Sequence, residues 1–259
     1  MFVDAHCHLG DEQFVNEIDA VVARAHQANV QIIVTAGVDE ATSRAAIALA
    51  EHYSNVYAVV GIHPEFAASF DDAQLEAIRA LAFHRKVIGI GEIGLDLYWQ
   101  NNPPRETQAR AFSAQLALAQ QLNKPVVIHN RNADDVLMSI LRAQIPSSSR
   151  AQGILHCFSG DLTMARQAID LGYLISFAGN VTFKNARALQ SIAQVLPLNS
   201  ITLETDAPYL SPMRGKRNEP ANVARVAGKI AELQNIELSV VEHATTHNCA
   251  MLFGLRIDK

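Results

Sequence analysis

The chain has 259 residues, 49% hydrophobic and 18% charged, a composition that excludes a disordered protein. Its 21 basic and 26 acidic residues give a formal net charge of −5, which excludes a generally basic protein that coats nucleic acid. No apolar run reaches the roughly 18 residues of a membrane span and the chain opens without a signal peptide, so we expect a soluble, cytoplasmic protein without a membrane partner.

Short apolar runs recur along the chain, as is typical of strands buried on both faces of a parallel sheet. Eight runs predict strands, from Phe2 to His6, Gln31 to Ala36, Tyr57 to Ile62, Val87 to Glu92, Val126 to His129, Gly153 to His156, Tyr173 to Ser176 and Ile201 to Glu204. Between and after them, apolar residues repeat at helical spacing. These stripes comprise Ile18, Val21, Val22 and Ala25; Phe112, Leu116, Ala119 and Leu122; and Val223, Val226, Ile230 and Leu233.

The alternation of strands and helices predicts a parallel sheet. Eight strand–helix units account for the whole length, which is close to the roughly 250 residues of a (β/α)8 barrel. We therefore predict a (β/α)8 TIM barrel in the α/β class, built as one domain over residues 1–259. An open doubly wound sheet is the alternative, but no glycine-rich phosphate fingerprint follows the first strand.

Metal-ligating residues collect at the carboxyl ends of the predicted strands, where the active site of such a barrel lies. The candidates are His6, His8, Glu92, His129, His156 and Asp206. His6 and His8 stand two residues apart and face the same side, while Cys7 turns away. Four histidines and two carboxylates at strand ends predict a metal site.

This set of candidates exceeds the three protein ligands of a single catalytic zinc and suits two divalent ions, with Glu92 as the bridge. No lysine stands at the end of that strand to form a carbamate bridge. Two divalent ions outweigh the charges of Glu92 and Asp206, so the centre stays positive and favours an anionic substrate such as a phosphodiester. Zinc, manganese and magnesium all remain open.

Several longer motifs together resemble the TatD family of metal-dependent hydrolases over nearly the full chain. The motifs are Asp4-Ala5-His6-Cys7-His8-Leu9, Gly61-Ile62-His63-Pro64, Gly91-Glu92-Ile93-Gly94-Leu95-Asp96, His156-Cys157-Phe158-Ser159-Gly160, Glu204-Thr205-Asp206-Ala207-Pro208-Tyr209-Leu210 and Arg214-Gly215-Lys216-Arg217-Asn218-Glu219-Pro220. The resemblance implies a metallo-dependent hydrolase barrel, the same six metal residues, and hydrolysis of DNA, often as a 3′-to-5′ exonuclease.

Three polar residues near the predicted ligands are candidates for supporting roles. The resemblance implies that His63 contacts the scissile phosphate or the leaving group; a purely structural histidine in a proline-bounded turn is the alternative. We expect Asp206 or Glu204 to help deprotonate the attacking water, and Glu204 alternatively to orient a ligand histidine or form an interior ion pair. Asp96 could cap the helix that follows its strand or support the metal ligands from behind, and we favour the capping role.

Basic and aromatic residues follow three of the strands and predict substrate contacts on the catalytic rim. Arg214, Lys216 and Arg217 form a dense basic cluster after the eighth strand, and Arg131 follows His129. We expect these four cations to bind phosphates of DNA. Tyr98 and Trp99 follow the fourth strand, where they could stack on a base or simply pack the loop.

The sequence leaves two other functions open. The same metal chemistry could hydrolyse an ester, lactone or amide, including an aminoacyl-RNA. A non-catalytic metal-binding or partner-binding protein is disfavoured by the intact ligand set. Cys7, Cys157 and Cys249 are odd in number and widely spaced, so we expect buried free thiols, and we expect a monomer with no protein partner.

Overall fold

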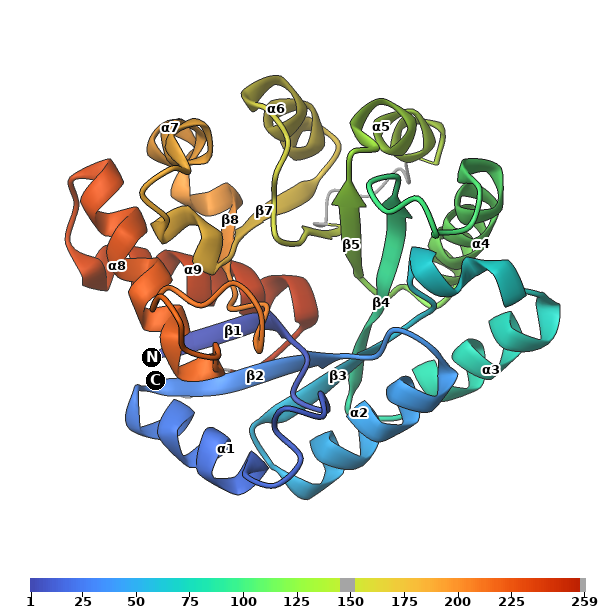
Figure 1. The fold of residues 1–259 in the computed structure, drawn as a ribbon, viewed down its shortest axis with the longest axis horizontal. Coiled ribbons are helices and arrows are strands. Elements are labelled where there is room, and N and C mark those ends of the chain that lie inside the picture. Colours follow the sequence, from blue (N-terminus) through green and yellow to red (C-terminus); the bar gives the residue numbers. More distant parts are fainter. Residues whose placement is uncertain (145–151, 257–259) are drawn as a thin grey trace.

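A ring of parallel strands surrounded by helices forms the centre of the molecule, which confirms the predicted TIM barrel (Figure 1). The computed structural model describes residues 1–144 and 152–256. Within these residues each strand pairs in parallel with the next along the chain. The strands are β1 (Phe2–Cys7), β2 (Val30–Ala36), β3 (Val56–Val60), β4 (Val87–Asp96), β5 (Val126–Arg131), β6 (Gly153–Leu155), β7 (Tyr173–Phe177) and β8 (Ile201–Leu203).

Two neighbouring strands extend further toward the catalytic end than the sequence predicted. β4 continues past Glu92 to Asp96, and β5 continues past His129 to Arg131. Gly94 pairs with His129 and has φ 145°, a conformation in which an added Cβ would collide with the His129 carbonyl oxygen. Glycine therefore allows β4 to approach β5 closely where His129 projects.

The ring closes between β1 and the segment that follows β8. The Asp206 amide donates to the His6 carbonyl at 3.0 Å, and the His8 amide donates to the Ala207 carbonyl at 2.7 Å. Asp4 is fully buried and accepts hydrogen bonds from the Thr205 amide at 2.8 Å and the Thr205 hydroxyl at 2.6 Å. These bonds bring the two ends of the strand order together and fix Asp206 beside His6.

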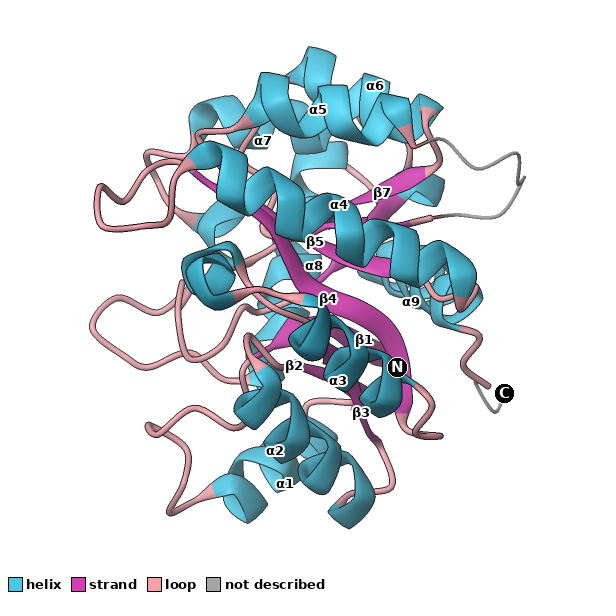
Figure 2. Cartoon of the chain, turned by 90° about the vertical axis from the view of Figure 1, so that its right-hand side faces the viewer, coloured by secondary structure: helices cyan, strands magenta, loops and turns pink. Residues whose placement is uncertain are grey.

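Helices cover the outside of the ring in both views (Figures 1 and 2). They are α1 (Ile18–Gln27), α2 (Glu40–His52), α3 (Asp72–Ala82), α4 (Arg105–Gln121), α5 (Asp134–Ala143), α6 (Leu162–Asp170), α7 (Arg187–Val195), α8 (Val223–Gln234) and α9 (Leu238–Phe253). Short 3-10 helices at 64–69, 179–182, 198–200 and 220–222 complete the connections. None of the helices in the described ranges is long and apolar enough to cross a membrane.

The helices bury the apolar stripes that the sequence predicts. Val21 and Ala25 of α1 are buried, as are Phe112 and Leu116 of α4. A smaller apolar cluster joins strand residues to Leu252 and Phe253 of α9. Because burial of each large apolar side chain contributes about 1.5–3 kcal/mol, this packing holds the strands that carry the site in a fixed arrangement.

Candidate metal centre

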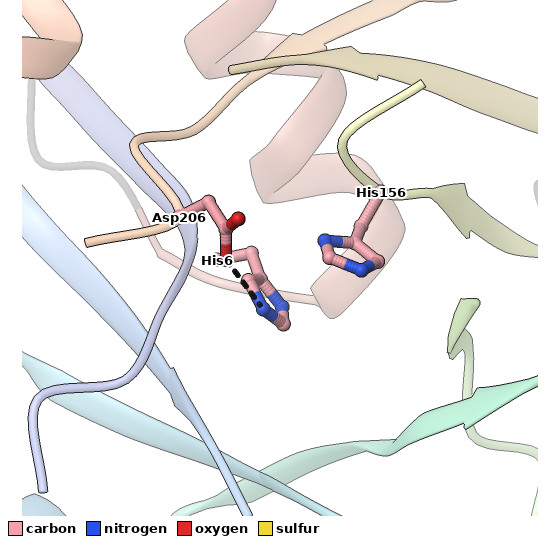
Figure 3. A group of neighbouring side chains, drawn as sticks. All are labelled: His6, His156 and Asp206. Carbon is pink, nitrogen blue, oxygen red and sulfur yellow. Dashed lines mark ion pairs between the residues drawn. The ribbon is translucent and has the colours of Figure 1, made fainter. Parts of the chain in front are cut away.

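The predicted metal residues come together at the catalytic ends of the strands, at one side of a cleft of about 900 Å3. In Figure 3, His6 at the end of β1 and Asp206 after β8 lie side by side and face His156, which follows β6. His6, Glu92 and His156 are buried, whereas His8, His129 and Asp206 are partly exposed to the cleft. The strands thus supply a shared set of nitrogen and oxygen donors.

One group of donor atoms surrounds Glu92 Oε2. The Nε2 atoms of His6 and His8 lie 3.3 Å apart. Glu92 Oε2 lies 3.4 Å from the first nitrogen and 3.5 Å from the second. Asp206 Oδ1 lies 3.7 and 3.5 Å from the same two nitrogens. These four atoms therefore form a compact group.

A second group of donor atoms surrounds Glu92 Oε1. This oxygen lies 2.9 Å from His129 Nδ1 and 2.9 Å from His156 Nε2. The two histidine nitrogens are 3.3 Å apart. His63 Nε2 lies 3.5 Å from the same oxygen. The two oxygens of Glu92 thus face different groups.

These distances fit two divalent ions. Ligand atoms of one tetrahedral ion with bonds of about 2.0–2.1 Å lie about 3.3 Å from one another. The separations between donor atoms in the two groups range from 2.9 to 3.7 Å, on either side of this value. Imidazole nitrogen and carboxylate oxygen are suited to zinc, manganese or related ions. The arrangement is consistent with a binuclear metal site, and it places Glu92 where a bridging carboxylate would stand.

The surrounding histidines control the charge of Glu92. Burial alone would raise the pKa of this carboxyl, but the neighbouring His156 and His63 outweigh burial and hold the pKa well below its ordinary value. Conversely, burial would lower the pKa of His156, whereas Glu92 and Glu204 raise it well above its ordinary value. Glu92 is therefore a carboxylate with its negative charge directed toward both donor groups.

His63 belongs to the same cluster, although the sequence placed it outside the ligand set. Its Nδ1 accepts a hydrogen bond from the Glu65 amide at 3.2 Å, which leaves the ring proton on Nε2, toward Glu92. Burial lowers the pKa of His63 to about 3. The side chain is thus a neutral imidazole at neutral pH, positioned between the cleft and the second donor group.

Two carboxylates contact His156 and His129 at the ring nitrogens that point away from Glu92. Glu204 Oε1 lies 3.3 Å from His156 Nδ1 and accepts from the Cys157 amide at 2.6 Å, and Ser176 donates to Glu204 Oε2 at 2.5 Å. Asp96 Oδ2 lies 3.1 Å from His129 Nε2. Such contacts fix the orientation and tautomer of a ligand histidine.

The role that we favoured for Asp96 from the sequence was wrong. The helix α4 begins nine residues later, at Arg105, and its N-cap is Pro104, without a side-chain cap. Asp96 instead remains in β4 because the strand is longer than predicted, and its carboxylate contacts His129.

Two buried glutamines of α4 position the strand ends, and sequence reasoning missed both. Gln108 pairs with the backbone of Asp96 through bonds of 2.8 and 2.9 Å. Gln115 pairs in the same way with Ile62, the residue before His63, at 2.7 and 3.0 Å. The available signal was their position on the face of α4 that also carries Phe112 and Leu116, where apolar residues are the norm.

The backbone is strained at one candidate ligand, Asp206, and directly after another, His156. Asp206 has φ 55° and Cys157, which follows His156, has φ 44°. A left-handed conformation costs a non-glycine residue about 1–2 kcal/mol, and such strain clusters at functional sites. Cys7 and Cys249 are buried free thiols as expected, whereas Cys157 is only partly buried and lines the cleft.

The predicted substrate-binding cations lie in different environments. Arg214 and Lys216 are exposed and do not line the cleft in the described structure. The Arg217 guanidinium faces the loop after β1, donating to the Gln13 carbonyl and pairing with Glu17 at 2.9 Å. Arg131, by contrast, lines the cleft together with the metal residues.

Known proteins match the chain over almost its whole length. The family model described as TatD related DNase matches residues 3–254. An uncharacterized metal-dependent hydrolase, YabD, from Bacillus subtilis is 38% identical and covers 98% of this chain and 100% of its own. A 3′-5′ ssDNA/RNA exonuclease, TatD, from Klebsiella pneumoniae is 35% identical and covers 98% of each chain.

The fold agrees with this assignment. The crystal structure of YjjV, a TatD homologue from Escherichia coli, superimposes with a TM-score of 0.92 at 33% identity and covers 98% of each chain. Together with the donor groups around Glu92, these similarities show that the chain belongs to the TatD family of metal-dependent hydrolases.

Proposed function

We propose that the protein hydrolyses phosphodiester bonds of single-stranded nucleic acid, with DNA as the favoured substrate and digestion from the 3′ end. The position of Glu92 between two donor groups carries the proposal. A pair of divalent ions held there would lower the pKa of a bound water and offset charge that develops on the phosphoryl oxygens. The 3′-5′ ssDNA/RNA exonuclease at 35% identity supports the choice of polymer and direction.

The side chains around the cleft have separate tasks in this reaction. Asp206 lines the cleft and directs Oδ1 toward His6 and His8, so its carboxylate is placed to accept a proton from the attacking water. His63 presents its Nε2 proton to the same space and can donate a hydrogen bond to the phosphate or the departing oxygen. Glu204 is fully buried behind His156 and acts by positioning this histidine.

Metal reconstitution tests the proposal. The protein is stripped of metal, given Mg2+, Mn2+ or Zn2+ separately, and incubated with a 5′-labelled single-stranded oligonucleotide beside simple esters and an aminoacyl-RNA. We expect a ladder of 5′-labelled fragments that shorten progressively with at least one ion. A preparation of Glu92→Gln, purified in parallel, controls for contaminating nucleases.

The same experiment separates this function from the alternative hydrolase. Hydrolysis of the esters or of the aminoacyl-RNA, with the oligonucleotide left intact under every ion, would replace the nuclease with a deacylase. Release of short labelled fragments from the 5′ end at the first time points would keep the phosphodiesterase and reverse the direction.

A further inference from the structure

Two exposed aromatic side chains stand at the rim of the cleft, in the loop that follows β4. Tyr98 and Trp99, which we call the aromatic platform, are 48% and 56% exposed. Their ring centroids lie 4.8 Å apart with the ring planes at 86°. Trp99 lines the cleft that also contains the candidate metal residues. Exposed aromatic faces of this size at a cleft are suited to stacking on a planar ligand.

Arg131 lies against the aromatic platform. Its guanidinium carbon is 4.0 Å from the centroid of the Tyr98 ring and 5.2 Å from that of Trp99. Among the described residues no carboxylate lies within ion-pair distance of Arg131, although the side chain lines the cleft. The aromatic rings therefore hold the cation in place without neutralising its charge, which remains available to an anion.

Asp96 ties the aromatic platform to the metal centre. Its Oδ1 accepts the amides of Tyr98 at 3.0 Å and Trp99 at 3.5 Å, while its Oδ2 lies 3.1 Å from His129 Nε2. The backbone amide of Leu97 also donates to the Arg131 carbonyl at 2.9 Å. One carboxylate thus sets the position of a candidate metal ligand and of both aromatic residues.

The backbone of Asp96 is itself held from two sides. Gln108 accepts from its amide at 2.8 Å and donates to its carbonyl at 2.9 Å, and Asn102 donates to the same carbonyl at 3.2 Å. A loop anchored in this way keeps its side chains at a fixed distance from the donor groups. Fixed distance is what a subsite needs if it is to place one particular bond at the reacting centre.

We propose that the aromatic platform and Arg131 form a nucleotide subsite in which Trp99 stacks on the base next to the scissile bond and Arg131 binds a neighbouring phosphate. The inference rests on the proposed function and adds to it the recognition of the base. Stacking does not depend on the identity of the base, so the subsite accepts all four bases and binds a nucleotide without a base more weakly.

The fluorescence of Trp99 reports directly on this subsite because the chain contains a single tryptophan. The metal-loaded protein is titrated with a single-stranded oligonucleotide whose last linkages are phosphorothioates, and with a matched oligonucleotide that has abasic residues at its two 3′-terminal positions. We expect saturable quenching with the first oligonucleotide, and a roughly tenfold weaker apparent affinity with the second. Equal quenching by both would show that the base does not contact Trp99.

Kinetics of the variants provide the second measurement. Trp99→Ala should raise KM for the base-bearing oligonucleotide roughly tenfold and remove the difference in KM between base-bearing and abasic ends. Trp99→Phe keeps an aromatic ring and should retain most of this difference in KM. Phe83→Ala is the matched control, since Phe83 is 73% exposed at the end of α3 and does not line the cleft. Arg131→Ala should flatten the salt dependence of binding by about 0.7 in the log–log slope.

The outcomes separate this inference from the function on which it rests. If the wild-type protein degrades base-bearing and abasic ends with the same KM while Trp99 fluorescence stays constant, the nucleotide subsite is wrong and the nuclease stands. If no oligonucleotide is cleaved under any ion while esters are, the proposed function is wrong and the subsite falls with it. Quenching that an aromatic ester saturates, but an oligonucleotide does not, would reassign the aromatic platform to a small planar substrate.

Discussion

The donor groups around Glu92 and the basic loop 214–217 lie on the same side of the barrel but are held very differently. The six predicted ligands come from five strands or the residues just after them, and their side chains are buried or partly buried. In the loop, Arg214 and Lys216 extend into solvent and Arg217 is directed toward Glu17. The comparison shows that side chains at strand ends are held in fixed positions by the sheet. A charged side chain in a rim loop, such as Arg217, can instead form an ion pair that stabilises the fold.

Replacement of Glu92 tests the donor groups at the strand ends and should have the largest effect on metal binding and activity. Glu92→Gln keeps the shape of the side chain but removes the charge shared by both donor groups. We expect loss of bound metal and a fall in activity beyond the roughly 10²- to 10³-fold that loss of a single charge-stabilising donor costs. Elemental analysis and kcat/KM measure both effects, with Glu76→Gln on the exposed face of α3 as the control. A variant that retained two ions per chain would contradict the bridging position.

Replacement of His63 tests whether this histidine is a metal ligand or contacts the substrate. If His63 contacts the substrate, His63→Ala retains the metal and lowers kcat and kcat/KM together by roughly 10²- to 10³-fold. His84→Ala, which removes a partly exposed histidine paired with Glu51, serves as the control. Loss of one ion would make His63 a ligand of the second group, and unchanged kinetics would return it to a structural role.

Replacement of Glu204 tests a residue that acts through a ligand. Glu204→Gln should lower metal affinity or activity by roughly 10- to 100-fold, because His156 loses the partner that orients its ring. Ser176→Ala, which removes the hydroxyl that donates to Glu204 Oε2, should have a smaller effect. Metal titration followed by activity compares the two variants. A larger loss of metal affinity or activity in Ser176→Ala than in Glu204→Gln would mean that Glu204 acts through local packing and not by orienting His156.

The basic loop should give the smallest effect. If Lys216 binds a phosphate beyond the scissile one, Lys216→Ala raises KM for a long oligonucleotide more than for a dinucleotide and flattens the salt dependence of binding by about 0.7 in slope. Arg44→Ala on α2 is the control. For Arg217→Ala we expect a lower melting temperature, since its partners are Gln13 and Glu17. An unchanged slope in Lys216→Ala would leave Lys216 without a role in binding.

Residues that act through the alternation of a strand could be predicted from the sequence. His6 and His8, two residues apart at the end of a strand, do face the same donor group. The eight strands could be predicted for the same reason, because buried parallel strands leave continuous apolar runs.

Contacts between elements that are distant in the sequence produce no periodic pattern of residues from which they could be predicted. The extension of β4 to Asp96 depends on pairing with β5 and on the backbone freedom of Gly94, neither of which appears as hydrophobic periodicity. Gln108 and Gln115 looked like ordinary polar residues of a helix until their backbone partners were known. The sequence therefore predicted which donor residues lie together and, for Glu204, one contact that orients a histidine, but it did not reveal the contacts of Asp96, Gln108 and Gln115.

The order in which the donors occur along the chain has a consequence for protein synthesis. The candidate ligands extend from His6 to Asp206, and a nascent chain that has emerged only as far as α7 carries five of the six. Such a chain also lacks Thr205, to which Asp4 bonds to close the ring. Binding of ions by all six candidates would thus have to follow the synthesis of β8 and the residues just after it. From then on an ion present at 100 times its dissociation constant would add about 2.7 kcal/mol to the free energy of unfolding of the barrel. The barrel would therefore become most resistant to unfolding only when the ions bind.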